Sequence, residues 1–365
     1  MRNILLILCP PVWHKLPPLG LAYVSEYLRS TGYNVDVVDL NVEEVNILEQ
    51  AGVYDEIGFS VFKSNEIETL ALVKKVKEKY PRKIILLGGP QCFSWQYEVN
   101  PDEVKLADEL IVGDYVLDLD ASFPTFDGFR LDKYERKRAL PILSSRGCIR
   151  TCAFCSERLL SKGFTIRRPE NVLKEIQYHK KINKTKWFTF HDSLINGDLN
   201  NLDELCDMLL GENIVWDAQA IIRRDMPEDL LSKMKKGGCF NLFIGLESGS
   251  SKMLKLMRKG FTTEDAEVFF TKCRNVGLHF ETSLIAGFPG ETEEDFAETL
   301  KFIEKNKDII PKIAQINPYI KYSGTEVEAV NANRGSERTN VFIRLVEELG
   351  IPYTKDFINN LVRGK

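Results

Sequence analysis

Three features that would each indicate a class of protein are absent from this sequence. None of its apolar runs approaches the roughly 18 to 20 residues that a membrane-spanning helix requires. The formal net charge is only −4 and charges of both signs are mixed, so we expect no nucleic-acid partner. The apolar segment Met1–Pro10 is too short for a secretory signal peptide and lacks a small-residue cleavage site, which favours a buried strand.

Cysteine spacing typical of disulfides is absent as well. The chain has eight cysteines and four histidines, and the cysteines do not pair by spacing, so we expect a reducing, cytoplasmic environment. Free cysteine is among the most commonly buried residue types, which predicts a place in the core for Cys9, Cys92, Cys206, Cys239 and Cys273. A second cluster built from Cys206, Cys239 and Cys273 is the alternative for those three.

The other three cysteines stand close together. Cys148, Cys152 and Cys155 follow an apolar run with the spacing CxxxCxxC. Three thiolates can ligate three irons of a four-iron cube and leave the fourth iron open to another ligand. Zinc also binds closely spaced cysteines, but it usually takes a fourth protein ligand, and no cysteine or histidine follows before His179. The spacing therefore predicts an iron–sulfur cluster, with a zinc or purely structural site as the alternative.

The N-terminal third alternates short β-branched runs with helical patterns. This alternation predicts a doubly wound, flavodoxin-like or Rossmann-like parallel sheet. The expected strands are Ile4–Leu8, Val35–Asp39, Glu56–Ser60, Ile84–Leu87 and Glu109–Val112, with helices over Leu19–Ser30 and Ile67–Lys79. Ligands of such sheets bind beyond the carboxyl ends of the strands. His14 lies in one such loop, where we interpret it as a solvated or hydrogen-bonded bystander, and we interpret Trp13 and Trp95 as packing residues.

After an irregular, partly charged linker at residues 118–139, strand and helix patterns alternate about six times. Strands are expected at Leu140–Ser145, Trp187–His191, Val215–Ile222, Phe240–Gly245, His279–Ala286 and Ala314–Ile320. Helices are expected at Pro169–Lys181, Asp203–Leu210, Pro227–Lys236, Thr263–Asn275 and Thr292–Asn306. Such repetition predicts a partial (β/α)6 TIM-like barrel at 140–326, with functional groups at the carboxyl ends of its strands. Residues 327–365 form a tail with one helix, Asn340–Leu349, which serves as a lid or as a packing element.

The CxxxCxxC spacing, with Phe154 before the last cysteine, resembles the signature of the radical S-adenosylmethionine (SAM) superfamily. The resemblance implies a [4Fe–4S] cluster on Cys148, Cys152 and Cys155, whose open iron binds SAM and whose electron cleaves it to a 5′-deoxyadenosyl radical. It also implies SAM contacts at the strand ends, from Phe154, Asp192, Ser193, Arg223, Glu247, Ser248, Ile285, Gly287 and Pro289. In the family the position of Asp192 and Ser193 holds the SAM ammonium group, and a guanidinium at Arg223 would pair with the carboxylate. Ser248, Thr263 and Thr292 could instead be helix caps only.

The N-terminal region resembles the cobalamin-binding domain that precedes many radical SAM domains. The resemblance is carried by Leu16–Leu28, Gly32–Asp39 and Gly88–Pro90, and it covers residues 1–117. It implies cobalamin contacts from Pro18, Leu19, Gly20, Ser60, Phe62, Gly88, Gly89, Pro90 and Gly113. An Asp-x-His-x-x-Gly motif is absent, and Val112–Val116 replaces the family's Gly-Glu-Gly-Glu, with no helix following it. A lobe that keeps the fold but binds nothing, or binds the substrate, is the alternative.

Together these features predict a cobalamin-dependent radical SAM methyltransferase that acts on an unactivated carbon of a small molecule or peptide. A low-potential donor such as flavodoxin or ferredoxin would supply electrons, and no residue is assigned a catalytic role. One alternative is a cobalamin-independent cyclase, isomerase or dehydrogenase. A methylthiotransferase would need three cysteines in the front lobe, which has only Cys9 and Cys92. A non-catalytic iron–sulfur scaffold or sensor is the last alternative.

Overall fold

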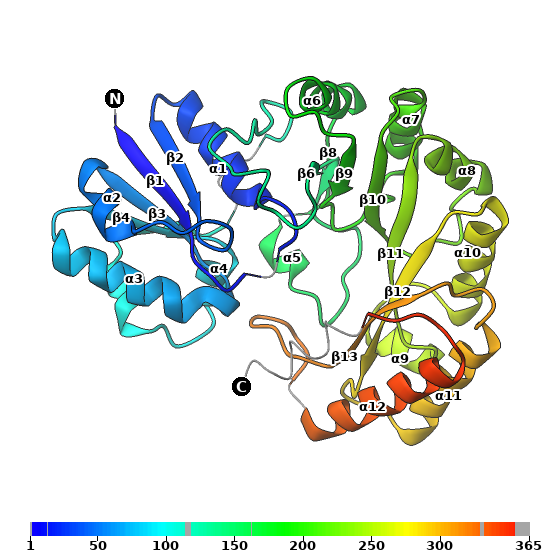
Figure 1. The fold of residues 1–365 in the computed structure, drawn as a ribbon. Coiled ribbons are helices and arrows are strands. Elements are labelled where there is room, and N and C mark those ends of the chain that lie inside the picture. Colours follow the sequence, from blue (N-terminus) through cyan, green and yellow to red (C-terminus); the bar gives the residue numbers. More distant parts are fainter. Residues whose placement is uncertain (1, 13, 114–117, 162, 329–331, 355–365) are drawn as a thin grey trace. The chain divides into compact units, whose positions relative to one another are not determined.

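The computed structural model describes residues 2–12, 14–113, 118–161, 163–328 and 332–354. The chain forms two compact units (Figure 1). The first unit comprises residues 1–142 and 174–187, and the second comprises residues 143–173 and 188 onward. Of the helices formed by the described residues, none combines the length and the apolar composition that crossing a bilayer requires.

The first unit is built on a parallel sheet. Its strands are β1 (Asn3–Leu8), β2 (Asn34–Asp39), β3 (Glu56–Ser60), β4 (Ile84–Gly88) and β5 (Glu109–Leu110), in the order β2-β1-β3-β4-β5. Its helices are α1 (Leu19–Ser30), α2 (Ile47–Gln50), α3 (Glu66–Lys79) and α4 (Pro90–Ser94). This strand order is the flavodoxin-like one, so the predicted doubly wound sheet is confirmed.

Both faces of this sheet are buried, and β1 shows why. Its side chains point alternately to the two faces. Leu5 and Ile7 pack in one core with Val73 of α3, whereas Leu6 packs in the other core with Leu28 of α1. A continuous apolar strand such as β1 is typical of a parallel sheet covered by helices on both sides.

One amide fixes the carboxyl edge of this sheet. The fully buried Asn65 donates from Nδ2 to the carbonyl oxygen of Cys9 at 2.9 Å and to that of Ser60 at 3.2 Å. Its Oδ1 accepts the N–H of Phe62 at 2.7 Å. Asn65 therefore ties the loop after β1 to the loop after β3.

The linker is irregular, as predicted, but it is packed against the first unit. Tyr134 donates to the Asp39 carboxylate at 2.9 Å, and Thr125 donates to Glu26 of α1 at 3.1 Å. Phe129 packs against the core that contains α1 and β2. The residues Asp114–Val116, where the sequence predicted a shortened end of the sheet, lie outside the described residues, as does Trp13.

The second sheet has the strand order of a partial barrel. Its strands are β6 (Ala139–Ile142), β9 (Trp187–Phe190), β10 (Val215–Ala220), β11 (Cys239–Glu247), β12 (Phe280–Ala286) and β13 (Ile313–Pro318), and they are neighbours in chain order. The strand-to-helix alternation confirms the predicted (β/α)6 fold. Helices α7 (Leu199–Leu209), α8 (Glu228–Lys236), α10 (Thr263–Val276) and α11 (Glu293–Lys305) follow successive strands and lie along one face of the sheet (Figure 1). The remaining elements are β7 (Ser145–Arg146), β8 (Thr165–Ile166), α5 (Glu157–Leu160), α6 (Pro169–Lys181), α9 (Ser251–Leu256) and α12 (Ala332–Glu348).

Two elements differ from the sequence-based expectation. The single strand expected at Leu140–Ser145 is divided into β6 and β7, because the N–H groups of Ser144 and Ser145 bind a side chain rather than a neighbouring strand. The last helix begins at Ala332 instead of Asn340. Its polar first turns pack on the sheet through tertiary contacts that a periodicity pattern does not contain.

The five dispersed cysteines occupy the core, as predicted: Cys9, Cys92, Cys206, Cys239 and Cys273 are buried and free. Burial raises the pKa of Cys9 to about 11 and that of Cys206 to about 12, so both remain thiols at neutral pH. In the part of the chain that the structure describes, no three His, Cys, Asp or Glu side chains are grouped to ligate one metal ion.

We predict that Asn65→Ala destabilises the first unit by about 2 to 4 kcal/mol, because two buried carbonyl oxygens and one N–H would lose their partners. Urea unfolding monitored by circular dichroism measures this. Asn100→Ala, at an exposed position, is the matched control and should unfold like the wild type. Equal midpoints for the two variants would contradict the role assigned to Asn65.

Candidate functional site

The cysteine loop lies between β7 and α5 in the second unit. Cys148, Cys152 and Cys155 are free and half-buried, and the sulfur of Cys148 accepts the N–H of Arg150 at 3.4 Å. Burial raises the pKa of Cys148 and of Cys155, and the neighbouring thiol of Cys152 acts in the same direction. Three cysteine ligands leave one iron of a four-iron cube open, whereas a structural zinc ion usually takes a fourth protein ligand. The donor set therefore suits an iron–sulfur cube better than a mononuclear zinc.

A close backbone contact shapes this loop. Gly147 adopts a φ of 76°, and a Cβ there would overlap the carbonyl group of Gly163, which follows α5. Only glycine satisfies both the left-handed conformation and this approach. The residue before Cys148 is thus fixed by the fold of the loop itself.

Asp192, predicted from the resemblance to bind SAM, has other partners in the structure. It is fully buried after β9, and its Oδ1 accepts the N–H of Ser144 at 2.9 Å, the hydroxyl of Ser145 at 2.7 Å and the N–H of Ser145. Burial raises the pKa of Asp192 to about 6, and these hydrogen bonds act against the rise. Its carboxylate holds the start of the cysteine loop, while the adjacent Ser193 is partly exposed.

Phe154 connects the cysteine motif to two other strand ends. Its ring packs against the cluster of Met253, Met257 and Phe288, and its centroid lies 6.2 Å from that of Phe288. The backbone N–H of the preceding residue, Ala153, donates to the carbonyl oxygen of Met257 at 3.0 Å. Ile285, another predicted SAM contact, packs against the same cluster.

Glu247 and a lysine that sequence reasoning missed form a buried ion pair. The Nζ of Lys259 lies 3.3 Å from Oε1 of Glu247, and both side chains are about nine-tenths buried. The hydroxyl of Ser283 on β12 donates to Oε2 of Glu247 at 3.1 Å. Glu247 has a φ of 70°, a conformation that is uncommon for a residue other than glycine and is concentrated at functional sites.

Lys259 also lies beside the cysteine loop. Its Nζ is 5.7 Å from the ring centroid of Phe154 and 5.7 Å from that of Phe261, and its charge favours the thiolate of Cys148. The only sequence signal was a basic residue in the run after α9, where a solvated side chain is the usual outcome. Its role depends on contacts between segments that are distant in the chain.

Arg223 and Ser248 are engaged with protein partners. Arg223 holds the Asp225 carboxylate in a fork, with Nε–Oδ1 at 2.9 Å and Nη2–Oδ2 at 2.6 Å, which lowers the pKa of Asp225. Its Nη1 donates to the carbonyl oxygens of Asn196 and Gly197. The hydroxyl of the buried Ser248 lies 2.9 Å from that of Thr299 on α11.

The loop after β12 places the last predicted SAM contacts. Ile285 and Pro289 are partly exposed, and Gly287 between them has a φ of 73°. Thr292 caps α11, since its Oγ1 accepts the N–H of Asp295 at 3.2 Å. The corresponding cap of α10 is Thr262 and not the predicted alternative Thr263.

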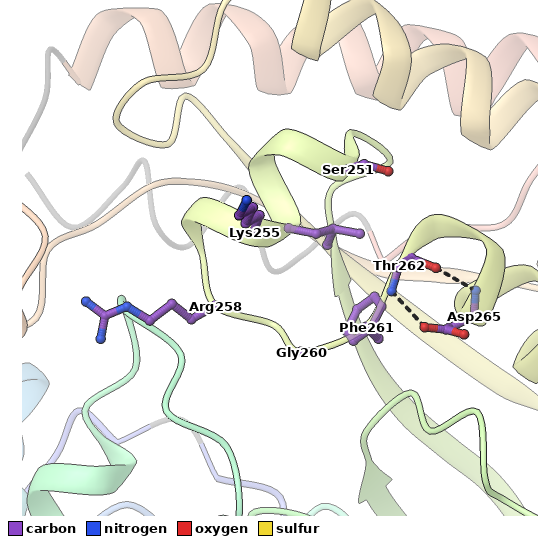
Figure 2. A pocket seen from close by; sticks show the side chains of 8 residues that line it. Ser251, Lys255, Arg258, Gly260, Phe261, Thr262 and Asp265 are labelled. Carbon is purple, nitrogen blue, oxygen red and sulfur yellow. Dashed lines mark hydrogen bonds between the residues drawn. The ribbon is translucent and has the colours of Figure 1, made fainter.

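A cavity of about 510 Å³ lies beside this region, at the connection from α9 to α10 (Figure 2). Thr262 and Asp265 are joined there by two hydrogen bonds, while Lys255 and Arg258 are basic residues of its lining. Gly260 borders the cysteine loop, because a Cβ on it would overlap the guanidinium of Arg150. Of the described residues that line this cavity, none belongs to the predicted SAM contacts.

The residues predicted to bind cobalamin lie at the carboxyl edge of the first sheet. In the first part of the unit, Pro18 is the N-cap of α1, Leu19 and Gly20 begin that helix, Ser60 ends β3 and Phe62 follows it. Further along, Gly88 ends β4, Gly89 is the N-cap of α4, Pro90 begins α4 and Gly113 follows β5. A Cβ on Gly20 or Gly113 would meet no described atom within 4 Å. Gly89 differs, because its φ of 102° and its approach to the Val61 backbone, 2.7 Å from a Cβ, are required by the turn itself.

His14 belongs to a buried polar cluster at the same edge. Its Nε2 lies 2.9 Å from Oδ2 of Asp39, which also accepts the hydroxyl of Tyr134. Burial lowers the pKa of His14, and the Asp39 carboxylate acts against this shift. His14 is therefore a partly buried residue that faces the Asp39 carboxylate and not a solvated one. Trp95 is a buried packing residue, as predicted, and its indole N–H donates to Glu66 at 2.8 Å.

Comparison with known protein families finds two matches, which cover different parts of the chain. Residues 142–303 match the radical SAM superfamily, and residues 7–104 match the B12 binding domain. The chain is a radical SAM protein with a B12-binding domain. Radical SAM enzymes use a [4Fe–4S] cluster, SAM and a reductant, and the second domain adds cobalamin to the implied cofactors.

Two relatives of this radical SAM protein match over most of its length. An uncharacterized methyltransferase, PH0819 of Pyrococcus horikoshii, is 24% identical over 85% of this chain and 77% of its own. The threonylcarbamoyladenosine tRNA methylthiotransferase MtaB of Thermotoga maritima is 26% identical over 92% of this chain and 80% of its own. Both similarities extend through the two domains.

The fold of this radical SAM protein is also that of a solved cobalamin-dependent relative. The radical SAM enzyme OxsB, solved with aqua-cobalamin bound, superposes with a TM-score of 0.69 at 19% identity. The match covers 95% of this chain and 56% of OxsB, so the chain spans little more than half of that protein. At this identity the similarity establishes the fold of both units.

We predict that Gly147→Ala loses most of its iron after anaerobic reconstitution, because the added Cβ displaces the backbone next to Cys148. The measurement is iron and sulfide per chain. Gly163→Ala is the matched control: its φ is also positive, at 92°, but a Cβ there meets nothing within 4 Å. It should suffer only local strain of about 1 kcal/mol and keep its iron. Equal iron content in the two variants would contradict the prediction.

Proposed function

We propose that this protein is a cobalamin-dependent methyltransferase that methylates an unactivated carbon of a small molecule or peptide. The observation that carries the proposal is one chain in which a B12-binding domain precedes a radical SAM domain with three clustered cysteines. The relative PH0819, which matches both domains, is named a methyltransferase. A carbon radical is no nucleophile toward a sulfonium methyl group, which explains why one chain would combine the two domains.

The loaded cofactors supply the chemistry: the cluster and SAM provide the radical that removes a substrate hydrogen, and cobalamin provides the methyl group. The protein's own residues hold and orient these groups. In the proposal Cys148, Cys152 and Cys155 bind the cluster, and Phe154 fixes their loop against Phe288. Gly287 and Pro289 offer backbone against which the nucleoside of SAM lies, and Glu247 and Ser248 face its ribose and methionine.

The charged ends of SAM need partners of opposite sign. Arg223 was predicted to pair with the carboxylate, but its fork already holds Asp225. Lys259 is a second cation, buried next to Phe154 and Cys148. We assign the SAM carboxylate to Lys259. In the alternative, the SAM carboxylate replaces the carboxylate of Asp225 on Arg223. The partly exposed hydroxyl of Ser193 remains for the ammonium group, since the oxygens of Asp192 bind the loop.

Cobalamin is assigned to the carboxyl edge of the first sheet, where open α/β sheets bind their ligands. The open space at Gly20 supports this assignment, because neither lack of room nor a left-handed conformation requires glycine there. Pro18, Leu19, Ser60, Phe62, Gly88, Gly89 and Pro90 complete the proposed contact set.

A methylthiotransferase reaction like that of the relative MtaB is disfavoured by the first unit. Such enzymes need three cysteines there for a second cluster, whereas Cys9 and Cys92 are the two that the sequence offers, and both are buried. A cobalamin-independent radical enzyme remains the rival, and methyl transfer distinguishes it.

The proposal includes the organisation predicted from the sequence. A cobalamin-binding region at 1–117 is followed by a linker at 118–139, the barrel at 140–326 and a tail at 327–365. The reductant is a flavodoxin or ferredoxin in the cytoplasm, where eight cysteines, all free in the structure, stay reduced.

The test uses protein reconstituted anaerobically with iron, sulfide and hydroxocobalamin, and then reduced with methyl-labelled SAM present. We expect about four irons per chain, a retained corrinoid spectrum and 5′-deoxyadenosine as a product. In the presence of a substrate, label passes to a carbon. Protein that retains no corrinoid at saturation but still forms 5′-deoxyadenosine would support the cobalamin-independent rival.

Lys259→Met should weaken SAM binding about 10-fold or more, because a buried cation facing the carboxylate is lost. Lys259→Arg, which keeps the charge, should restore most of the affinity. Equilibrium dialysis of cluster-loaded protein measures both, and Lys255→Met, at an exposed site on α9, is the matched control. Unchanged SAM affinity in Lys259→Met would restrict Lys259 to pairing with Glu247.

A further inference from the structure

The helix α12, whose role the sequence left undecided, makes direct backbone contact with the loop after β12. A Cβ on Gly287 would lie 2.7 Å from the Cα of Gly335 in α12. A Cβ on Gly335 would in turn lie 3.0 Å from Cβ of Pro318 and 3.3 Å from the carbonyl oxygen of Ala286. Two glycines therefore allow the helix to rest on the ends of β12 and β13.

The segment after this helix is anchored to the same sheet. The N–H of Ile313, the first residue of β13, donates to the carbonyl oxygen of Pro352 at 2.9 Å, and Ile313 forms a bridge with Tyr353. The helix is thus held at its beginning by the glycine contact and beyond its end by main-chain pairing. This arrangement is that of a packed element and not that of a detached lid.

Arg338 lies one turn beyond Gly335 and is buried. Its guanidinium forms an ion pair with Glu291, donates to the carbonyl oxygen of Thr292 at 3.1 Å and donates to Glu293 at 2.6 Å. It also lies 4.9 Å from the ring centroid of Phe296. All four partners belong to the loop after β12 or to the helix α11 that follows it.

Glu291 links Arg338 to the backbone just after β12. Its Oε2 accepts the N–H of Gly287 at 2.8 Å, and its side chain is almost completely buried. A buried carboxylate requires a cation or several donors, and burial raises the pKa of Glu291 against the effect of Arg338. Arg338 therefore keeps Glu291 charged and in place, and Glu291 holds the backbone between Ile285 and Pro289.

We propose that Arg338 is a positioning residue for SAM: through Glu291 it fixes the Gly287 backbone against which the SAM nucleoside lies. The inference rests on the SAM site of the proposed function, and it assigns part of that site's geometry to the C-terminal helix. Arg338 touches neither SAM nor the cluster in this scheme.

The test measures SAM affinity, iron content and thermal stability of cluster-loaded Arg338→Met. We expect a SAM dissociation constant raised about 10-fold or more, with iron per chain and the rate of 5′-deoxyadenosine formation at saturating SAM close to wild type. Arg344→Met, at an exposed position of the same helix, is the matched control and should bind SAM normally.

A second variant keeps the test decisive if Arg338→Met does not fold. Glu291→Gln retains an oxygen that can accept the Gly287 N–H but loses the ion pair, and it should raise the dissociation constant by a smaller factor than Arg338→Met. If these variants melt earlier yet bind SAM as the wild type does, Arg338 is structural only and the inference is overturned. Wild-type protein that binds no SAM would instead refute the proposed function itself, and with it the site that Arg338 serves.

Discussion

The candidate site depends on the buried carboxylate of Asp192. A charge in an apolar interior is costly unless hydrogen bonds surround it, and among the described residues Ser144 and Ser145 donate these hydrogen bonds to Asp192. Ser144 lies between β6 and β7, Ser145 begins β7, and β7 leads the chain into the cysteine loop. The loop therefore cannot leave its place without abandoning a buried charge, and this requirement fixes Cys148 at the end of the barrel strands.

Two buried ion pairs extend this order to the neighbouring strand ends. Lys259 binds Glu247 after β11, and Arg338 binds Glu291 after β12. Buried pairs contribute little to net stability, because desolvation offsets much of the attraction, but removing one partner is strongly destabilising. Their effect is on conformation, because each ion pair holds a loop in one arrangement. Glu247 adopts an uncommon positive φ in this arrangement.

The first unit organises its binding edge by a different means. The side chain of Asn65 joins two loops through hydrogen bonds to main-chain atoms. The Asp39 carboxylate accepts hydrogen bonds from Tyr134 and Asn41 and faces His14. Around these fixed points Gly20 and Gly113 leave space free of side chains. Hydrogen bonds fix the loops of this edge, and glycines without side chains lie at its surface. This combination suits a large planar ligand.

The sequence by itself determined the elements whose signals are local. Apolar periodicity located α1 and α3 and most strands of both sheets to within a few residues, and the spacing of Cys148, Cys152 and Cys155 identified the cluster loop. Only the tertiary structure decided which polar groups face one another. It showed that Ser144 and Ser145 donate hydrogen bonds to Asp192, and that Lys259 and Arg338 form buried ion pairs. It also showed that α12 begins at Ala332. Periodicity reports which face of an element is buried, whereas the pairing of two charged groups from distant segments is decided only when folding brings those segments together.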